Sequence, residues 1–124
     1  MTAEPRQLPV TALVVAKAPV PGLAKTRLAA SVGADAAADI AAAALLDTLD
    51  AVADTPVEAR VVAMTRALRR ACRAPELRDR LAAFTVVEQR GDDFAARLVN
   101  AHADAAAATG RPVLQIGMDT PQVS

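Results

Sequence analysis

The sequence contains very few aromatic residues and a single cysteine. Its 124 residues include two phenylalanines but neither tryptophan nor tyrosine, so base-stacking platforms are scarce and the core must be aliphatic. One cysteine can form neither an intramolecular disulfide nor a cysteine-based metal cluster. Basic and acidic residues number 14 each, and a net charge of zero supplies no cationic field for nucleic acid. We therefore expect no nucleic-acid partner.

The sequence also lacks an apolar run long enough to cross a membrane. The strongly apolar stretch near the N-terminus, residues 10–16, ends at Lys17, far short of the ~20 residues that a spanning helix needs. No basic segment precedes it, as a signal peptide would require, and no lipidation motif is present. These absences predict a cytoplasmic protein with no membrane partner.

Short apolar runs alternate with helical patterns along the chain. The runs predict strands at residues 10–16, 57–64, 84–87 and 112–116. Amphipathic, alanine-rich patterns predict helices at residues 35–53 and 94–109, a helical segment capped by Thr65 that runs to about Arg73, and a helical turn beginning at Pro75. This alternation predicts an α/β domain with a parallel sheet, in which ligands bind beyond the carboxyl ends of the strands.

The segment at residues 16–28 combines turn-forming residues with positive charge. Two prolines and a glycine prevent a strand or helix from continuing there, and the segment leads into an expected helix start, where free backbone N–H groups favour an anion. Its cations are Lys17, Lys25 and Arg27. These features indicate a phosphate site, and the alternative is a solvated basic loop. The glycines of a Walker A loop and of a GxGxxG fingerprint are absent, which excludes an ordinary P-loop NTPase.

The remaining candidate residues indicate structural roles. His102 has no cysteine or second histidine to complete a metal site, so we expect it to pack on its helix. Cys72 is expected to be an inert small side chain. The arginines between residues 66 and 73 are expected to form a solvated face paired with Glu76 or Asp79.

Three motifs in this sequence resemble those of one known family. Residues 16–28 match every fixed position of Ala-Lys-Ala-Pro-x-Pro-Gly-x-x-Lys-Thr-Arg-Leu, the opening typical of DUF2064 proteins. The stretch from Gln89 to Leu98 is similar to the family's Gln-x-Gly-Asp-Leu-Gly-x-Arg, with Asp93 and Phe94 where Leu and Gly are usual. Residues 116–121 are similar to its Ile-Gly-x-Asp-Ser/Thr-Pro. The family lies in the GT-A nucleotide-diphospho-sugar transferase superfamily and includes arsenosugar-biosynthesis glycosyltransferases.

The resemblance implies a Rossmann-like GT-A fold, a three-layer sandwich with a mainly parallel sheet. It implies a transferase that binds a nucleotide-diphospho-sugar or nucleotide with Mg²⁺ or Mn²⁺ and transfers a glycosyl or nucleotidyl group. In that site Lys25 and Arg27 would act in catalysis by neutralising the diphosphate, and Asp119 would bind the metal. The implied nucleotide-binding residues are Ala16, Lys17, Pro21, Gly22, Lys25, Arg27, Gln89, Gly91, Asp92 and Arg97.

The domain is expected to be the N-terminal portion of the GT-A fold. Residues 1–8 are expected to form a flexible N-terminus and residues 9–124 the nucleotide-binding domain, truncated at its C-terminal side because family members are commonly longer. Two alternatives follow: a truncated, non-catalytic nucleotide-binding module, or an interaction domain whose exposed edge strand pairs with a partner or forms a homodimer. The three hypotheses predict different outcomes. A transferase requires metal-dependent turnover, and a non-catalytic module allows nucleotide binding without turnover. An interaction domain predicts association that does not depend on nucleotide.

Overall fold

The computed structural model describes residues 7–21, 32–65 and 70–116. Within these residues the chain forms seven elements: β1 (Leu8–Ala16), α2 (Ala34–Ala53), β2 (Val57–Met64), α3 (Ala74–Leu81), β3 (Thr85–Glu88), α4 (Phe94–Thr109) and β4 (Val113–Ile116). The strands are all parallel and lie in the order β3-β2-β1-β4. No helix in the described ranges is long and apolar enough to span a membrane.

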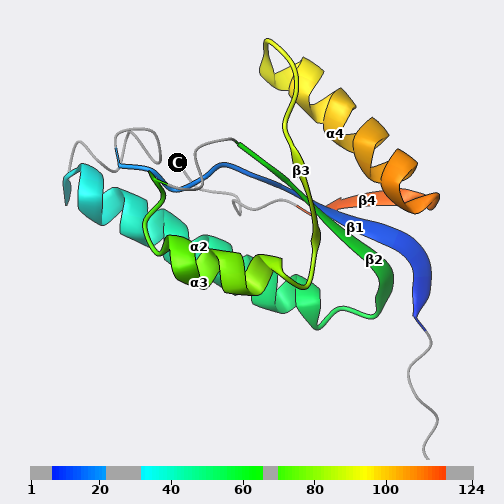
Figure 1. Cartoon of the computed structure of the whole chain (residues 1–124), viewed down its shortest axis with the longest axis horizontal. Helices are drawn as coiled ribbons and strands as arrows, with labels where there is room; N and C mark the ends of the chain where they lie inside the picture. The colour runs from blue at the N-terminus through cyan, green and yellow to red at the C-terminus, as the bar shows by residue number, and fades with distance from the viewer. Residues whose placement is uncertain (1–6, 22–31, 66–69, 117–124) are drawn as a thin grey trace, which may run out of the picture.

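The sheet is the middle layer of three. Helices α2 and α3 lie on one side of it and α4 lies on the other (Figure 1). Successive residues of a strand face opposite sides, so Val14 of β1 packs in the cluster that contains Leu45 of α2, whereas Leu13 packs in the cluster that contains Ala101 of α4. Burial on both faces explains why β1 and β2 read as almost continuous apolar runs.

The direction in which the sheet is built changes once. From β1 the chain steps outward to β2 and then to β3, and it then returns to place β4 on the other side of β1. The two outward steps cross over through α2 and α3, and the return crosses through α4 on the opposite face. A parallel sheet with helices on both faces and one such reversal is a doubly wound arrangement, and folds of this kind bind ligands beyond the carboxyl ends of their strands.

Local signals account for most of the element bounds. The strand expected at residues 57–64 and the helix expected at residues 94–109 have the predicted bounds. The carboxylate of Asp93 accepts a hydrogen bond from the Ala96 backbone N–H at 2.7 Å and caps α4, which ends at Gly110 with a φ of 67°. Strand β1 begins two residues earlier than expected, because the Leu8 backbone N–H donates to the Pro56 carbonyl at 2.8 Å.

The segment after β2 differs from its prediction. The Thr65 hydroxyl accepts a hydrogen bond from the Ala18 backbone N–H at 2.9 Å, a partner 47 residues away. The backbone N–H groups that Thr65 was predicted to cap belong to residues outside the described ranges. Residues 66–69, and the helical turn expected at residues 26–28, lie outside the described residues. Arg73 adopts a left-handed conformation, with a φ of 54°, immediately before α3.

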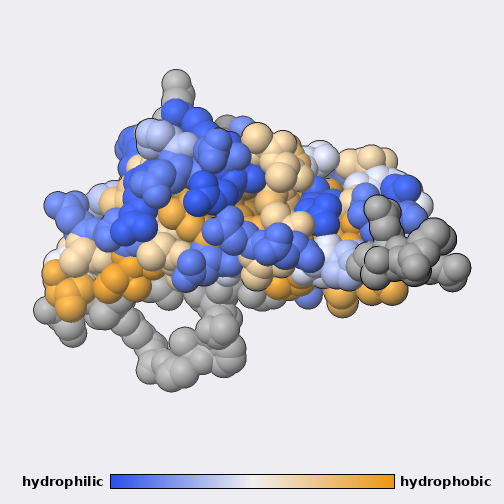
Figure 2. Space-filling model, turned by 90° about the horizontal axis from the view of Figure 1, so that it is seen from below, coloured by the Kyte–Doolittle hydropathy of each residue, from blue (hydrophilic) through white to orange (hydrophobic). Residues whose placement is uncertain are grey.

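The outer surface of α2 and α3 is mainly hydrophilic, as Figure 2 shows from that side of the molecule. Arg73 of this layer forms a two-pronged ion pair with Asp39 of α2, at 2.8 and 3.1 Å, and does not pair with Glu76 or Asp79 as the sequence predicted. Arg80 bonds Asp50 of α2 at 2.9 Å. These exposed pairs join the two helices across the surface and leave their apolar sides to the sheet.

Candidate functional site

A pocket of about 320 Å³ opens at the carboxyl ends of β1, β2 and β3. Its lining comes from the end of β1, the residue after β2, the residue after β3 and the first turn of α4: Val15, Ala16, Lys17, Thr65, Gln89, Phe94 and Arg97. The carboxyl ends of parallel strands meet at one edge of the sheet, which is where doubly wound folds hold their ligands. The pocket is therefore the candidate site.

Contacts with the rest of the protein fix the residues that follow β1. The Ala18 backbone N–H donates to the Thr65 hydroxyl, the Val20 N–H donates to the Ala18 carbonyl at 2.9 Å, and the Cys72 N–H donates to the Pro19 carbonyl at 3.0 Å. Ala18, Pro19 and Val20 are buried, whereas Lys17 is exposed. The structure thus holds Lys17 at the pocket on a fixed backbone.

These contacts also use the backbone donors of residues 18–21. Two of the four residues donate their N–H groups within the protein, and the other two are prolines, which have none. The first part of the loop therefore offers a phosphate the charge of Lys17 and not a cradle of backbone N–H groups. The predicted helix-start contribution falls on residues 22–28, with Gly22, Lys25 and Arg27, which lie outside the described residues.

Gln89 joins the ends of two strands at the pocket. Its side-chain Nε2 donates to the Ala16 carbonyl at 2.7 Å and to the Ala63 carbonyl at 3.1 Å, and its backbone N–H donates to the Met64 carbonyl at 3.0 Å. Because both side-chain partners are carbonyl oxygens, the amide nitrogen must face them, and both of its hydrogens are used. Gln89 therefore positions the end of β1, and its Oε1 is the atom through which it would accept a hydrogen bond from a ligand.

The loop between β3 and α4 is packed tightly against the start of the helix. Gly91 has a φ of 132°, and a Cβ atom there would lie 2.7 Å from the Arg97 backbone nitrogen, so the position requires glycine. The Arg97 side chain donates to the Gly91 carbonyl at 3.2 Å. Because Asp93 caps the helix with its own carboxylate, the start of α4 already has a negative partner. Charge for an external anion at this pocket comes instead from Lys17 and Arg97.

A second set of contacts holds the same loop to the body of α4. The Arg90 guanidinium forms two hydrogen bonds with the Asp104 carboxylate, at 2.7 and 3.0 Å, and the Asn100 side chain donates to the Arg90 carbonyl at 2.9 Å. The hydrogen bond from Arg90 lowers the pKa of Asp104 below its ordinary value. Together these contacts fix the segment that presents Gln89 and Arg97 to the pocket.

The structure brings together part of the predicted nucleotide-binding set. Ala16, Lys17, Gln89 and Arg97 line the pocket. The other described members, which are not among its lining residues, are Pro21, Gly91 and Asp92. Gly22, Lys25 and Arg27, together with Asp119, the predicted metal ligand, lie outside the described residues.

Three of the described lining residues were not predicted as part of the site: Val15, Thr65 and Phe94. Thr65 directly follows a predicted strand, which is the same sequence signal that marked the loop beginning at Lys17. Phe94, the first residue of α4, is 70% exposed and is one of the two phenylalanines in the sequence. The sequence feature that could have identified Phe94 is an aromatic residue immediately after a polar loop, at a predicted helix start.

The charged groups of the pocket favour an anion. Among the residues that the structure describes, its charged lining residues are the cations Lys17 and Arg97. In the described part of the chain, no three His, Cys, Asp or Glu side chains come together to hold a metal ion. No carboxylate is among the described residues that line this pocket, and in the sequence Asp119 follows β4 by three residues. Strand β4 pairs with β1 up to Val14 and Ile116, which places its end beside that of β1.

A second depression lies on α4, with a volume of about 410 Å³. Its lining is almost entirely apolar: Ala95, Leu98, Val99 and His102. His102 Nε2 forms a 2.6 Å hydrogen bond with Gln115 Oε1, which joins α4 to β4 and confirms the expected packing role. This depression lacks the charged groups of the pocket at the carboxyl edge.

The fold and the pocket define a doubly wound α/β domain with a cation-lined site at its carboxyl edge. The chain belongs to the DUF2064 family, described as uncharacterized proteins conserved in bacteria, which matches residues 48–124, more than half of the sequence. The match begins after the basic segment at residues 16–28. The family named from the motifs is therefore confirmed. Among curated proteins, none matches this chain.

The fold is also that of a solved structure. A crystal structure from Desulfovibrio desulfuricans G20, described as a "putative nucleotide-diphospho-sugar transferase", is similar with a TM-score of 0.70 and 26% sequence identity. The match covers 92% of this chain and 48% of that one, so the chain spans about half the length of that protein. The predicted α/β fold of the GT-A type is thereby confirmed.

Proposed function

We propose that this chain is the nucleotide-binding part of a GT-A-like transferase that acts on a nucleotide-diphospho-sugar or a nucleotide. The observation that carries the proposal is the pocket at the carboxyl edge, which brings Lys17 and Arg97 together with polar groups from the ends of three strands. The similarity to a structure described as a nucleotide-diphospho-sugar transferase supports the same class of ligand.

The chemistry of transfer explains why cations are needed. When a glycosyl or nucleotidyl group is transferred, the bond to a phosphate oxygen breaks and negative charge develops on the leaving phosphate or diphosphate. Positive groups held in place before the reaction stabilise that charge. Lys17 is fixed by the bonded segment that follows it, and Arg97 is fixed by the packed loop before α4. Lys25 and Arg27 supply further positive charge in this proposal.

The proposal includes Mg²⁺ or Mn²⁺, held by Asp119 together with oxygens of the diphosphate. A single carboxylate is a suitable ligand for these cations when substrate phosphates complete the coordination shell. When bound, the metal neutralises part of the diphosphate charge. Lys17 and Arg97, described at the pocket, would add their positive charge to that of the metal.

Thermal unfolding in the presence of ligands tests the proposal. The chain is melted with UDP, GDP, CDP, dTDP and ADP, each with Mg²⁺, with Mn²⁺ and without metal. Binding to the folded state raises the melting temperature by mass action, equivalent to about 2.7 kcal/mol when the ligand is at 100 times its Kd. We expect one of these nucleotides to raise it more than the others, and Asp119→Asn to remove the metal-dependent part of the shift.

The variant Lys17→Ala distinguishes the site from general charge effects. We expect it to weaken nucleotide binding by about tenfold or more, because a charge-assisted contact to phosphate is lost. The matched control is Arg78→Ala, which removes one positive charge from the exposed surface of α3 and should leave the affinity unchanged. A cooperatively folded chain that shows no shift with any nucleotide would refute the proposal. Binding without turnover of a nucleotide sugar would favour the non-catalytic module.

A further inference from the structure

Phe94 has the largest exposed fraction among the large apolar side chains of the described residues, at 70%. The contact of α4 with the sheet is made farther along the helix, by Ala101 and Ala105, which are buried. Phe94 instead lies at the first position of the helix and lines the pocket beside Arg97. A phenyl ring in this position contributes little to the core, and its environment indicates a contact with a ligand.

The backbone that carries this ring is fixed. Asp93 caps the first turn of α4, and Gly91 approaches the Arg97 backbone so closely that no side chain fits there. The ring therefore projects from a helix start whose position does not depend on the ring itself. A rigid aromatic side chain on a fixed backbone is well suited to bind a flat ligand, because little conformational entropy is lost on binding.

The groups around Phe94 specify the kind of ligand. The pocket has an aromatic ring at Phe94, ammonium and guanidinium groups at Lys17 and Arg97, and polar groups at Thr65 and Gln89. A ligand that satisfies all of them has a planar ring and a negatively charged portion. The apolar depression farther along α4 lacks the charged groups, so an apolar protein surface would fit there and not at Phe94.

Resting on the proposed function, we propose that Phe94 stacks on the heterocyclic base of the nucleotide, while Lys17 and Arg97 face its phosphates. Every base has an aromatic face, so the contact adds affinity for nucleotides as a class without selecting one base. The ring thus favours the binding of nucleotides over that of sugar phosphates and inorganic pyrophosphate, which have no base.

The test compares nucleotide and pyrophosphate binding in matched variants. Dissociation constants are measured for the nucleotide that gives the largest melting shift and for inorganic pyrophosphate, with wild type, Phe94→Leu, Phe94→Trp and Val99→Ala. Phe94→Leu keeps an apolar side chain and removes the ring. Val99 lies on the same helix with a nearly equal exposed fraction, 68%, but outside the pocket, so it controls for loss of exposed apolar surface.

We expect Phe94→Leu to raise the Kd for the nucleotide by about fivefold to a hundredfold. The Kd for pyrophosphate should stay within about twofold of the wild-type value. Phe94→Trp should restore binding, and Val99→Ala should change neither constant. Equal loss for both ligands, or unchanged nucleotide affinity in Phe94→Leu, would overturn the stacking contact and leave the proposed function standing. A wild type that binds no nucleotide would overturn both.

A spectroscopic measurement on the wild type provides a second test that needs no variant. Stacking lowers the absorbance of a nucleobase near its maximum, and a chain without tryptophan or tyrosine contributes little absorbance there. We expect the absorbance of the bound nucleotide to fall on saturation with wild type and to fall less with Phe94→Leu. Unchanged absorbance in the saturated wild-type complex would overturn the stacking contact.

Discussion

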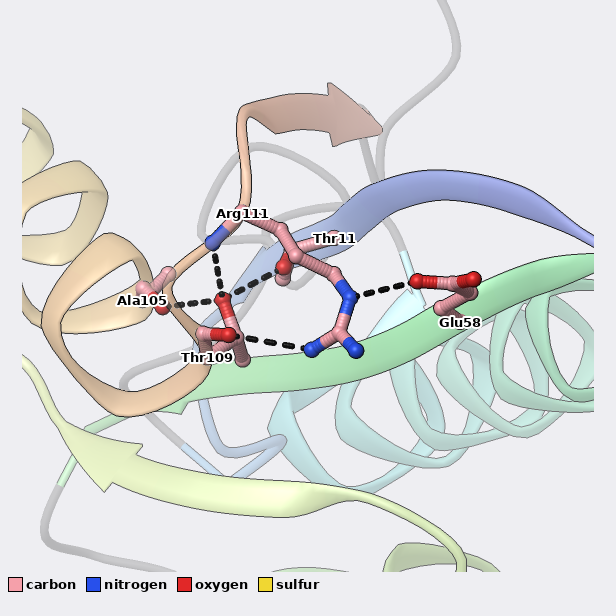
Figure 3. Close-up of polar contacts among 5 residues, drawn as sticks. All are labelled: Thr11, Glu58, Ala105, Thr109 and Arg111. Atoms are coloured by element: carbon pink, nitrogen blue, oxygen red, sulfur yellow. Dashed lines mark hydrogen bonds and ion pairs between the residues drawn. The ribbon is translucent and has the colours of Figure 1, made fainter.

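At the amino ends of the strands, polar side chains form hydrogen bonds and ion pairs with one another. At the carboxyl ends, other polar and charged side chains line a pocket. In the first region the buried hydroxyl of Thr11 lies 2.6 Å from that of Thr109, and Arg111 bonds Glu58 at 2.6 Å and the Thr109 carbonyl at 3.0 Å (Figure 3). In the second region Lys17 and Arg97 line a cavity. Polar and charged side chains thus contact one another at one end of the sheet, whereas at the other end they line a pocket that a ligand can enter.

The hydrogen-bond donors and acceptors at the amino ends of the strands satisfy one another. The Thr109 hydroxyl donates its single hydrogen to the Ala105 carbonyl at 2.8 Å, so in its other contacts it must accept. Thr11 is then the donor to Thr109, and the Arg111 backbone N–H contacts the same oxygen at 3.4 Å (Figure 3). Arg111 is committed to partners within the protein, whereas Arg97 contacts the Gly91 carbonyl at 3.2 Å and still lines the pocket. We therefore expect the amino edge to contribute mainly to stability and the carboxyl edge mainly to binding.

Gln89 is the exception in this comparison, because it is a structural residue at the carboxyl edge. Gln89→Glu replaces an amide that donates to two carbonyl oxygens with a carboxylate that has no hydrogen to donate at pH 7. The Ala16 and Ala63 carbonyls lose their donor and face a negative charge instead. We expect this variant to lower the free energy of unfolding by about 2–4 kcal/mol, measured by urea denaturation.

The same substitution at Gln115 is the control. Gln115 is exposed, and its Oε1 faces the His102 ring nitrogen at 2.6 Å, an acceptor role that glutamate keeps. We expect Gln115→Glu to change the stability by no more than about 0.5 kcal/mol. If Gln89→Glu were as stable as Gln115→Glu, the amide would not hold the ends of β1 and β2 together, and Gln89 would belong with the residues that serve binding alone.

Thr11→Val tests whether the amino edge contributes to stability alone. Valine has nearly the shape of threonine and removes the hydroxyl that donates to Thr109, while Thr109 keeps its contacts with Ala105 and Arg111. We expect a loss of about 1 kcal/mol in the free energy of unfolding, the usual contribution of one buried hydrogen bond. The Kd for nucleotide should stay within about twofold of wild type. A larger change in affinity would show that the two edges are coupled through β1.

The features that the sequence predicted are those set by local signals. Strand β2 and helix α4 have their predicted bounds because apolar patterning and the glycine at the end of α4 are read from neighbouring residues. Lys17 was placed at the site because its loop follows a strand and parallel strands end at one edge, whereas Gln89 was placed there by the family resemblance. The alternation of strands and helices predicted the parallel sheet, and the resemblance implied the three-layer sandwich, but the strand order β3-β2-β1-β4 was not predicted.

The features that the sequence did not predict depend on distant partners. The bond between Thr65 and Ala18 joins residues 47 positions apart, and the pair of Arg73 and Asp39 joins residues 34 positions apart. For Arg73, local patterning favoured a partner within the same segment, and the tertiary structure pairs it with Asp39 instead. The contact between Thr65 and Ala18 was not predicted, because local patterning gives no information on so distant a partner. The exposure of Phe94 likewise depends on where α4 crosses the sheet, which helical periodicity alone does not give.

The smallest effect we expect concerns the ion pair that holds the loop beside the pocket. The hydrogen bond from Arg90 lowers the pKa of Asp104 from its ordinary value of 3.8, so the folded state binds this proton less readily than the unfolded state. The stability that the ionised carboxylate contributes is therefore fully present above the ordinary pKa and is lost as the pH falls through the lower folded value.

Asp104→Asn should lower the urea midpoint above about pH 5 by less than Thr11→Val does, because the pair is exposed to solvent. The difference between wild type and Asp104→Asn should shrink as the pH is lowered below 3.8. Asp47→Asn, which removes one negative charge from the exposed surface of α2, is the control for net charge. A difference that stayed constant down to pH values near 2 would show that Arg90 acts on Asp104 through its packing and not through its charge. The fixed loop at the pocket would then owe its position to Asn100 and Gly91, whose contacts do not titrate.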